Sequence, residues 1–233
     1  MNNKNLALPI SIVIAGIIIA GTIYYTKKSA SPTNNTNPVP AQKQEIKGPK
    51  EITDDDHILG NPDATLTFIL YTDLECPFCK KFNDTLNQMM DEYGKQGKVR
   101  LVFRHFPLDQ LHTKSRKEAE ATECAADLGG NEAFWKYVNR LFDITPSSDG
   151  LDPAELPKIA EYVGLDKNKF NDCFNSEKFA NKVQGYYEDA VASGAQGTPF
   201  FIIINKKGEK FPVSGAIPYQ ELKIALDQLL TAK

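Results

Sequence analysis

Histidine is scarce in this sequence, and basic charge is not in excess. The 233 residues include three histidines, too few for a histidine-rich metal site. Lys and Arg together number 27, against 30 Asp and Glu. Proteins that bind nucleic acid by neutralising phosphates carry clustered Lys and Arg, so we expect no nucleic-acid partner. A chain of this length can bury an ample core in one large domain or two small ones.

Charged side chains are missing altogether from residues 6–25. About twenty apolar residues is the length of helix that crosses a bilayer. A cleaved signal peptide has a shorter apolar region and small residues at its cleavage site, whereas Lys28 stands where a small residue is required. We therefore predict an uncleaved transmembrane anchor within an N-terminal segment 1–28. A cleaved signal peptide and a buried soluble helix are the alternatives, and positive charge on both flanks leaves the orientation open.

Apolar side chains are almost missing from the next segment, residues 29–50, which is rich in Pro, Asn, Ser, Thr and Lys. This composition predicts a flexible linker between membrane and domain. The composition becomes globular from residue 51.

Apolar runs and helical periodicity alternate beyond the linker. Strands are predicted at residues 64–74, 98–108, 198–205 and 211–214. A helix follows the first strand, a helical block separates the second strand from the third, and a last helix ends the chain. This order predicts an α/β fold with an inserted all-helical domain. The predicted parts of the globular region are 51–110, the inserted domain 111–193, and 194–233.

The two thiols of "ECPFCKK" are Cys76 and Cys79, and they lie between a predicted buried strand and a predicted helix. Structural zinc usually takes two such cysteine pairs, and only one is present, so we expect no metal. A structural disulfide over so short a loop removes little entropy from the unfolded chain. A thiolate at a helix N-terminus faces free N–H groups, which lower its pKa. The placement therefore favours redox exchange, with Cys76 as the nucleophile and Cys79 as the resolving thiol.

Several motifs in order resemble the DsbA-type thiol–disulfide oxidoreductases of the thioredoxin superfamily (DsbA/DsbG-like). They are "GNPDATLTFILYTDLECPFCKKF", "FRHFPL", "AFWKYVNRLF", "GLDKNKFNDCF" and "GAQGTPFFIIIN", and together they cover roughly residues 52–231. The resemblance implies a thioredoxin fold with a helical domain inserted after the second core strand. We expect no cofactor.

The resemblance also implies a role for the segment around Pro199. Pro199 is expected to be a cis proline facing the thiols, although a trans turn proline is the simpler interpretation of the pattern alone. Substrate peptides are expected to pair with the backbone around Thr198 as an added strand. Pro77 and Phe78, between the two cysteines, complete the predicted substrate-binding set.

Two positions depart from the pattern of the superfamily. Members often carry a buried acid six residues before the nucleophile, and here that residue is Leu70. Asp73 or Glu75 could replace it, or both could be solvated carboxylates at the junction. Phe78 cannot donate the hydrogen bond that a histidine at this position gives the thiolate. Since a more stabilised thiolate makes the cysteine pair more oxidising, this departure argues against a very strongly oxidising pair.

The remaining cysteines, Cys124 and Cys173, fall on predicted buried helix faces. In an oxidising compartment we expect them to form a structural disulfide across the inserted domain, with buried free thiols as the alternative. His105 near a strand end could tune the thiolate, but a histidine with ordinary core or surface partners is the simpler interpretation.

These inferences predict a membrane-tethered bacterial enzyme that introduces disulfides into secreted or cell-envelope proteins. The expected partners are reduced client proteins and, as the resemblance implies, a quinone-linked membrane thiol oxidase of the DsbB or VKOR kind. The domain must then lie outside the cytoplasm, on a single-pass anchor in the cell membrane. A disulfide isomerase or reductase is one alternative, and a thiol-independent chaperone or binding module is another.

Overall fold

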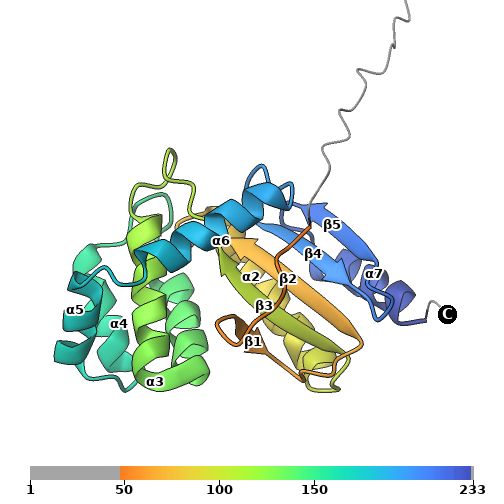
Figure 1. Ribbon diagram of the computed structural model, residues 1–233, viewed down its shortest axis with the longest axis horizontal. Helices are drawn as coiled ribbons and strands as arrows, with labels where there is room; N and C mark the ends of the chain where they lie inside the picture. The colour runs from red at the N-terminus through yellow and green to blue at the C-terminus, as the bar shows by residue number, and fades with distance from the viewer. Residues whose placement is uncertain (1–47, 232–233) are drawn as a thin grey trace, which may run out of the picture. The chain divides into compact units, whose positions relative to one another are not determined.

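The computed structural model describes residues 48–231 as a mixed sheet with helices on both faces and a helical block at one end (Figure 1). The strands are β1 (His57–Leu59), β2 (Leu66–Thr72), β3 (Val99–His105), β4 (Phe200–Ile204) and β5 (Lys210–Ser214). The longer helices are α2 (Pro77–Met89), α3 (Ser115–Ile144), α4 (Leu156–Tyr162), α5 (Lys167–Asn175), α6 (Ala180–Ala192) and α7 (Tyr219–Thr231). A π-helical turn, Met90–Gly94, extends α2, and a 3-10 turn, Pro153–Glu155, precedes α4.

The strand order across the sheet is β1-β3-β2-β4-β5. β2 and β3 are parallel, while the other three pairs are antiparallel. Every residue of β2 is buried, as expected for a central strand covered on both faces. In register, Leu70 lies opposite Phe103 on one side and Phe201 on the other. The strand that leads to the thiols is therefore held in the middle of the sheet.

Alternate side chains of β2 enter two separate cores, because successive residues of a strand point to opposite faces. Phe68 packs with Phe82 of α2 and Phe201 of β4, in the core that also contains Leu222 of α7. Tyr71 lies in the second core with Ala190 of α6. Helices α2 and α7 thus cover one face and α6 the other, so that the predicted α/β fold is built in three layers.

The helical block α3–α5 lies between β3 and β4 in sequence, where an insertion was predicted, and α6 runs from it across to the sheet (Figure 1). The sequence predicts two helices separated near Gly129. The structure has one continuous span, α3, interrupted at Gly130, whose φ of 70° is non-helical. A positive φ has a low conformational free-energy cost only for glycine. The helix is therefore interrupted at a glycine, one residue from the predicted break.

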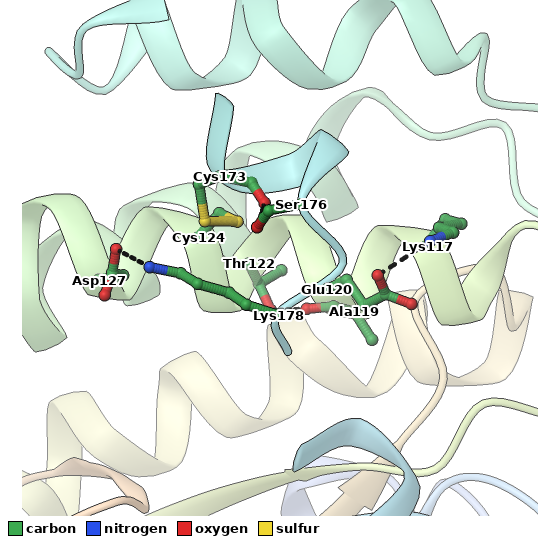
Figure 2. The surroundings of a disulfide bond; sticks show 9 residues. All are labelled: Lys117, Ala119, Glu120, Thr122, Cys124, Asp127, Cys173, Ser176 and Lys178. Carbon is green, nitrogen blue, oxygen red and sulfur yellow. Dashed lines mark hydrogen bonds and ion pairs between the residues drawn. A yellow bond between two sulfur atoms is a disulfide. The ribbon is translucent and has the colours of Figure 1, made fainter. Parts of the chain in front are cut away.

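A disulfide joins Cys124 of α3 to Cys173 of α5, with the two Cα atoms 5.9 Å apart (Figure 2). Both sulfurs belong to buried residues. Nearby, Lys178 Nζ donates to Asp127 Oδ2 at 2.7 Å, a second and more exposed link to the outer side of α3. The bridge lies inside the helical block, as expected from the buried helix faces.

Removing this bridge is expected to destabilise the folded protein. A Cys124→Ala/Cys173→Ala variant should lose about 2–4 kcal/mol of unfolding free energy, because the bridge closes a long loop in the unfolded chain. The measurement is urea unfolding without reductant, with and without the bridge, in chains that carry Cys76→Ser and Cys79→Ser. An unchanged midpoint would show that the helical block does not depend on the bridge.

The sequence did not predict β1, a three-residue edge strand antiparallel to β3. Its pairing covers an edge that would otherwise expose backbone groups of β3. The predicted anchor, residues 6–25, and most of the predicted linker lie outside the described residues. Within residues 48–231, none of the helices has the length and apolar character needed to span a bilayer.

Candidate redox site

The two thiols lie where β2 ends and α2 begins. Cys76 is the N-cap of α2 in extended conformation, and Pro77 occupies the first turn, where its missing N–H is not needed. Pro77 and Phe78 are exposed, Phe78 by 66%, whereas Cys79 is buried beneath them. Cys76 and Cys79 are free thiols. The dipeptide between the cysteines thus faces outward, and the second thiol faces the core.

The segment before β4 faces Cys76. The Thr198–Pro199 peptide is cis, and the Cys76 thiol donates to the carbonyl oxygen of Thr198 at 3.7 Å. Thr198 Oγ1 is buried and makes no hydrogen bond of ordinary length to another described residue. The structure therefore brings Cys76, Cys79, Thr198 and Pro199 together, as the resemblance implied, and their roles in catalysis stay predictions.

The two thiols have very different proton affinities. A hydrogen bond from the Cys79 thiol, followed by the Thr198 side chain and the N–H groups of Cys79 and Phe78, lowers the pKa of Cys76 to about 6. Burial, followed by the neighbouring Cys76, raises the pKa of Cys79 well above its ordinary value. The thiolate is therefore stabilised by the partner thiol and the helix N-terminus, with Phe78 in place of a histidine.

The lowered pKa predicts how alkylation of the reduced protein depends on pH. The rate of reaction of Cys76 with iodoacetamide should rise to its half-maximum near pH 6, because only the thiolate reacts. In a Cys79→Ala variant the midpoint should move upward, toward the ordinary value of 9.0, since the largest stabilising hydrogen bond is gone. A wild-type midpoint near that ordinary value would contradict the prediction.

Asp73 and Glu75 are buried, 1% and 0% exposed, so the interpretation of solvated junction carboxylates is wrong. Asp73 accepts the backbone N–H of Glu75 at 2.8 Å and that of Leu108 at 2.7 Å. Its Oδ2 also lies 3.0 Å from Nδ1 of His112. The carboxylate of Asp73 thus connects the thiol loop to the loop that follows β3.

Glu75 forms a buried acidic pair with Glu118 of α3. Burial raises the pKa of Glu118 to about 10, and a hydrogen bond to Glu75 adds to the rise. The Glu75 side chain also accepts from Thr145 Oγ1 at 3.3 Å. Since two close carboxylates in a dry site do not both ionise, the pair holds a proton at neutral pH and carries no more than one charge behind Cys76.

His105 lies in the core and contacts other polar side chains rather than the thiols in the structure. Its Nε2 is 3.0 Å from Thr122 Oγ1 and 3.3 Å from Glu123 Oε1. Glu123 is further paired with His57 and Lys182. This cluster joins α3 and α6 to the sheet, which fits the simpler interpretation of His105. Among the described residues no group of His, Cys, Asp and Glu side chains is arranged to hold a metal ion.

The sequence prediction missed Glu118 and His112 near the thiols. Both come from the segment just after β3, more than 30 positions from Cys76. The available signal was local: Glu118 lies three and seven positions before Ala121 and Ala125, which are apolar residues on a buried side of α3. A charged residue in an apolar helical stripe predicts a paired or protonated side chain.

Comparisons with known proteins agree with this geometry. A family model described as Thioredoxin matches residues 52–228. A crystal structure of DsbA2 from Pseudomonas aeruginosa is 28% identical, with a TM-score of 0.65 over 77% of this chain and 97% of that one. Oxidised BdbD from Bacillus subtilis, 24% identical, has a TM-score of 0.68 over 79% of this chain and 97% of that chain, and shows the shared fold.

A third likeness covers only part of a much longer protein. The chain is 32% identical to the Na(+)/H(+) antiporter NhaA 3 of Salinispora tropica over 154 residues, which is 66% of this chain and 22% of that protein. The chain thus spans about a fifth of the length of this curated relative.

Proposed function

Because this chain belongs to the thioredoxin family as a DsbA-like thiol–disulfide oxidoreductase, we propose that it introduces disulfide bonds into proteins outside the cytoplasm. The observation that carries the proposal is that the pKa values of the two thiols are shifted in opposite directions. The pKa of Cys76 is lowered, and that of the buried Cys79 is raised. A stabilised Cys76 thiolate favours the reduced form of the pair, which makes the oxidised form a better donor of disulfides.

The reaction is a two-step exchange of thiols. A client thiolate attacks the sulfur of Cys76 in the oxidised pair, the Cys76–Cys79 bond breaks, and a mixed disulfide forms between the client and Cys76. Cys79 leaves with the electron pair and takes up a proton, which its raised pKa favours. A second client thiol then loses its proton and attacks the client sulfur, so that Cys76 leaves as a thiolate. The client loses two electrons, and the pair gains them.

The segment around Thr198 holds the client in this scheme. The carbonyl of Thr198 already faces Cys76, and an extended client can hydrogen-bond there as an added strand. Pro77 and Phe78 lie exposed beside the nucleophile and provide further contact. A quinone-linked membrane oxidase of the DsbB or VKOR kind is proposed to reoxidise the pair.

The proposed location is the outer face of the cell membrane, through an anchor at residues 6–25. Protease treatment of intact cells tests it: the globular domain should be degraded while cytoplasmic proteins stay intact. Protection of the domain would place it inside, and the proposed oxidase role would then be wrong.

The reduction potential of the full chain in glutathione buffers tests the direction of exchange. We expect a value between about −180 and −120 mV, the range of disulfide donors. The Cys124–Cys173 bridge stays in place, since it is buried and contributes to stability. A value near about −270 mV would mark a reductase and contradict the proposal.

A further inference from the structure

A cleft of about 410 Å³ opens between the loop that follows β3 and the end of α6. One wall is the loop 106–111, and the other is α6 with the residues that follow it. The rings of Phe106 and Tyr187 meet at its base, with centroids 5.2 Å apart. Six of the nine residues that line it are apolar or aromatic, namely Phe106, Leu108, Leu111, Tyr187, Val191 and Ala195, and the other three, Asp109, Gln110 and Gln196, are polar.

Both walls are attached to the segments that form the redox site. The Phe106 N–H donates to the carbonyl of Thr72 at 2.8 Å, and the Leu108 N–H donates to Asp73 at 2.7 Å, just before the thiols. The opposite wall ends at Gln196, two residues before Thr198. Two residues span at most about 7 Å, so this wall ends next to the carbonyl that faces Cys76.

Two exposed large apolar side chains line the cleft, and a third lies in the thiol loop. Within residues 48–231, six large apolar side chains are exposed, and three of them are Phe78, Leu111 and Val191. Phe78 stands beside Cys76, while Leu111 (69% exposed) and Val191 (51% exposed) line the cleft. Clustered apolar exposure marks an interaction site, whereas single exposed residues do not.

The cleft walls are held in place without a ligand. Arg116 of α3 donates to Asp109 of the loop at 2.6 Å and to Gln184 of α6 at 3.1 Å. Its guanidinium also lies 5.8 Å from the centre of the Tyr187 ring. One side chain thus bridges both walls, and the apolar surface is preformed.

We propose that this cleft binds an aliphatic or aromatic side chain of the client, two positions from the client cysteine that reacts with Cys76. The inference rests on the proposed function and adds a substrate preference to it. In an extended segment, side chains two positions apart point to the same side. A client whose cysteine points at Cys76 therefore directs the side chain at that position toward the same surface of the protein, on which the cleft wall that ends at Gln196 approaches Thr198.

The test compares two single-cysteine peptides, one with Leu and one with Ser at both positions two residues from the cysteine. The oxidised full chain should form the mixed disulfide with the Leu peptide at least about tenfold faster. A Leu111→Ser/Val191→Ser variant should reduce this preference to near one. Ile224→Ser, which changes an equally exposed residue of α7, is the matched control and should keep the full preference.

A second variant guards against loss of folding. Val191→Trp fills the cleft from its exposed rim and should also remove the preference for Leu, with a melting temperature measured for each protein. Equal rates for both peptides in the wild type, or a preference that survives in both variants, would overturn the inference while leaving the redox function intact. If the wild type oxidises neither peptide nor glutathione, the proposed function itself fails. A dimer that dissociates in both variants would instead assign the cleft to a second copy of the chain.

Discussion

A Cys76→Ser variant is expected to lose disulfide exchange by a factor of about 1,000 or more, the scale on which removing a covalent nucleophile lowers a rate. The reason is geometric as well as chemical. Both cysteines are buried, Cys76 4% and Cys79 2% exposed, but Cys76 is the thiol that faces the carbonyl of Thr198 at the start of α2. We therefore expect a client sulfur to react at Cys76. The measurement is the rate at which the oxidised chain forms disulfides in a reduced test protein.

The matched variant is Cys79→Ser, which keeps the nucleophile and removes the resolving thiol. Mixed with the oxidised test protein, its Cys76 thiolate should attack a client disulfide, release one client thiol and accumulate as a mixed disulfide, visible as a slower band on a non-reducing gel. Cys76→Ser should give no such band. Trapping at Cys79 instead would reverse the assigned roles. Unchanged activity of a double variant lacking both thiols would support a thiol-independent binding module.

The second large effect is expected at Arg104, in the middle of the fold. An Arg104→Met variant should lose about 3–5 kcal/mol of unfolding free energy, because two buried carboxylates are left without their partner. Arg104 is 2% exposed and binds Asp56 at 2.8 Å and Asp189 at 2.7 Å. Tyr71 donates to the same Asp189 carboxylate. Urea unfolding of the variant and the wild type measures the loss.

Arg100 provides the control, since it lies on the same strand and is only partly buried. Its guanidinium donates to Thr67 Oγ1 at 2.8 Å and to the Pro62 carbonyl at 2.9 Å, without an acidic partner. Arg100→Met should therefore cost only about 1 kcal/mol. Similar losses for the two variants would mean that the network of Arg104 is no more important than ordinary hydrogen bonds.

The local parts of the fold could be predicted because their signals are contiguous. Every residue of β2 is buried, so residues 66–72 form one dense apolar run, and the helix begins directly at Pro77. The pair of thiols at that junction needed no long-range information. By contrast, β1 has three residues after three consecutive aspartates, and its partners lie more than 40 positions away on β3. A segment that short carries no periodicity from which a strand can be inferred.

The buried polar groups could not be predicted, for the same reason of distance. The sequence favours an exposed Glu75, because charged residues are rarely buried. Its protonated partner, Glu118, is 43 positions away in the sequence. The alternation of residues 98–108 places Arg104 on one face of a strand, but the two aspartates that allow its burial come from the segment before β1 and from α6. Only the folded chain brings these charges together.

The contacts of Lys50 determine how mechanical tension enters the folded domain. The Lys50 N–H donates to Asp189 Oδ1 at 2.8 Å, and its carbonyl accepts from Arg104 at 3.2 Å. The carbonyl of Glu51 accepts from the same guanidinium. A force applied to the chain before Lys50 therefore acts first on α6 and β3 together, through Asp189 and Arg104. The hydrogen bonds of Lys50 and Glu51 to these two residues must break before the force reaches β1. Arg104 lies opposite Tyr71 in the register of β2 and β3, so this first point of contact is at the end of β2 that leads to the thiol loop.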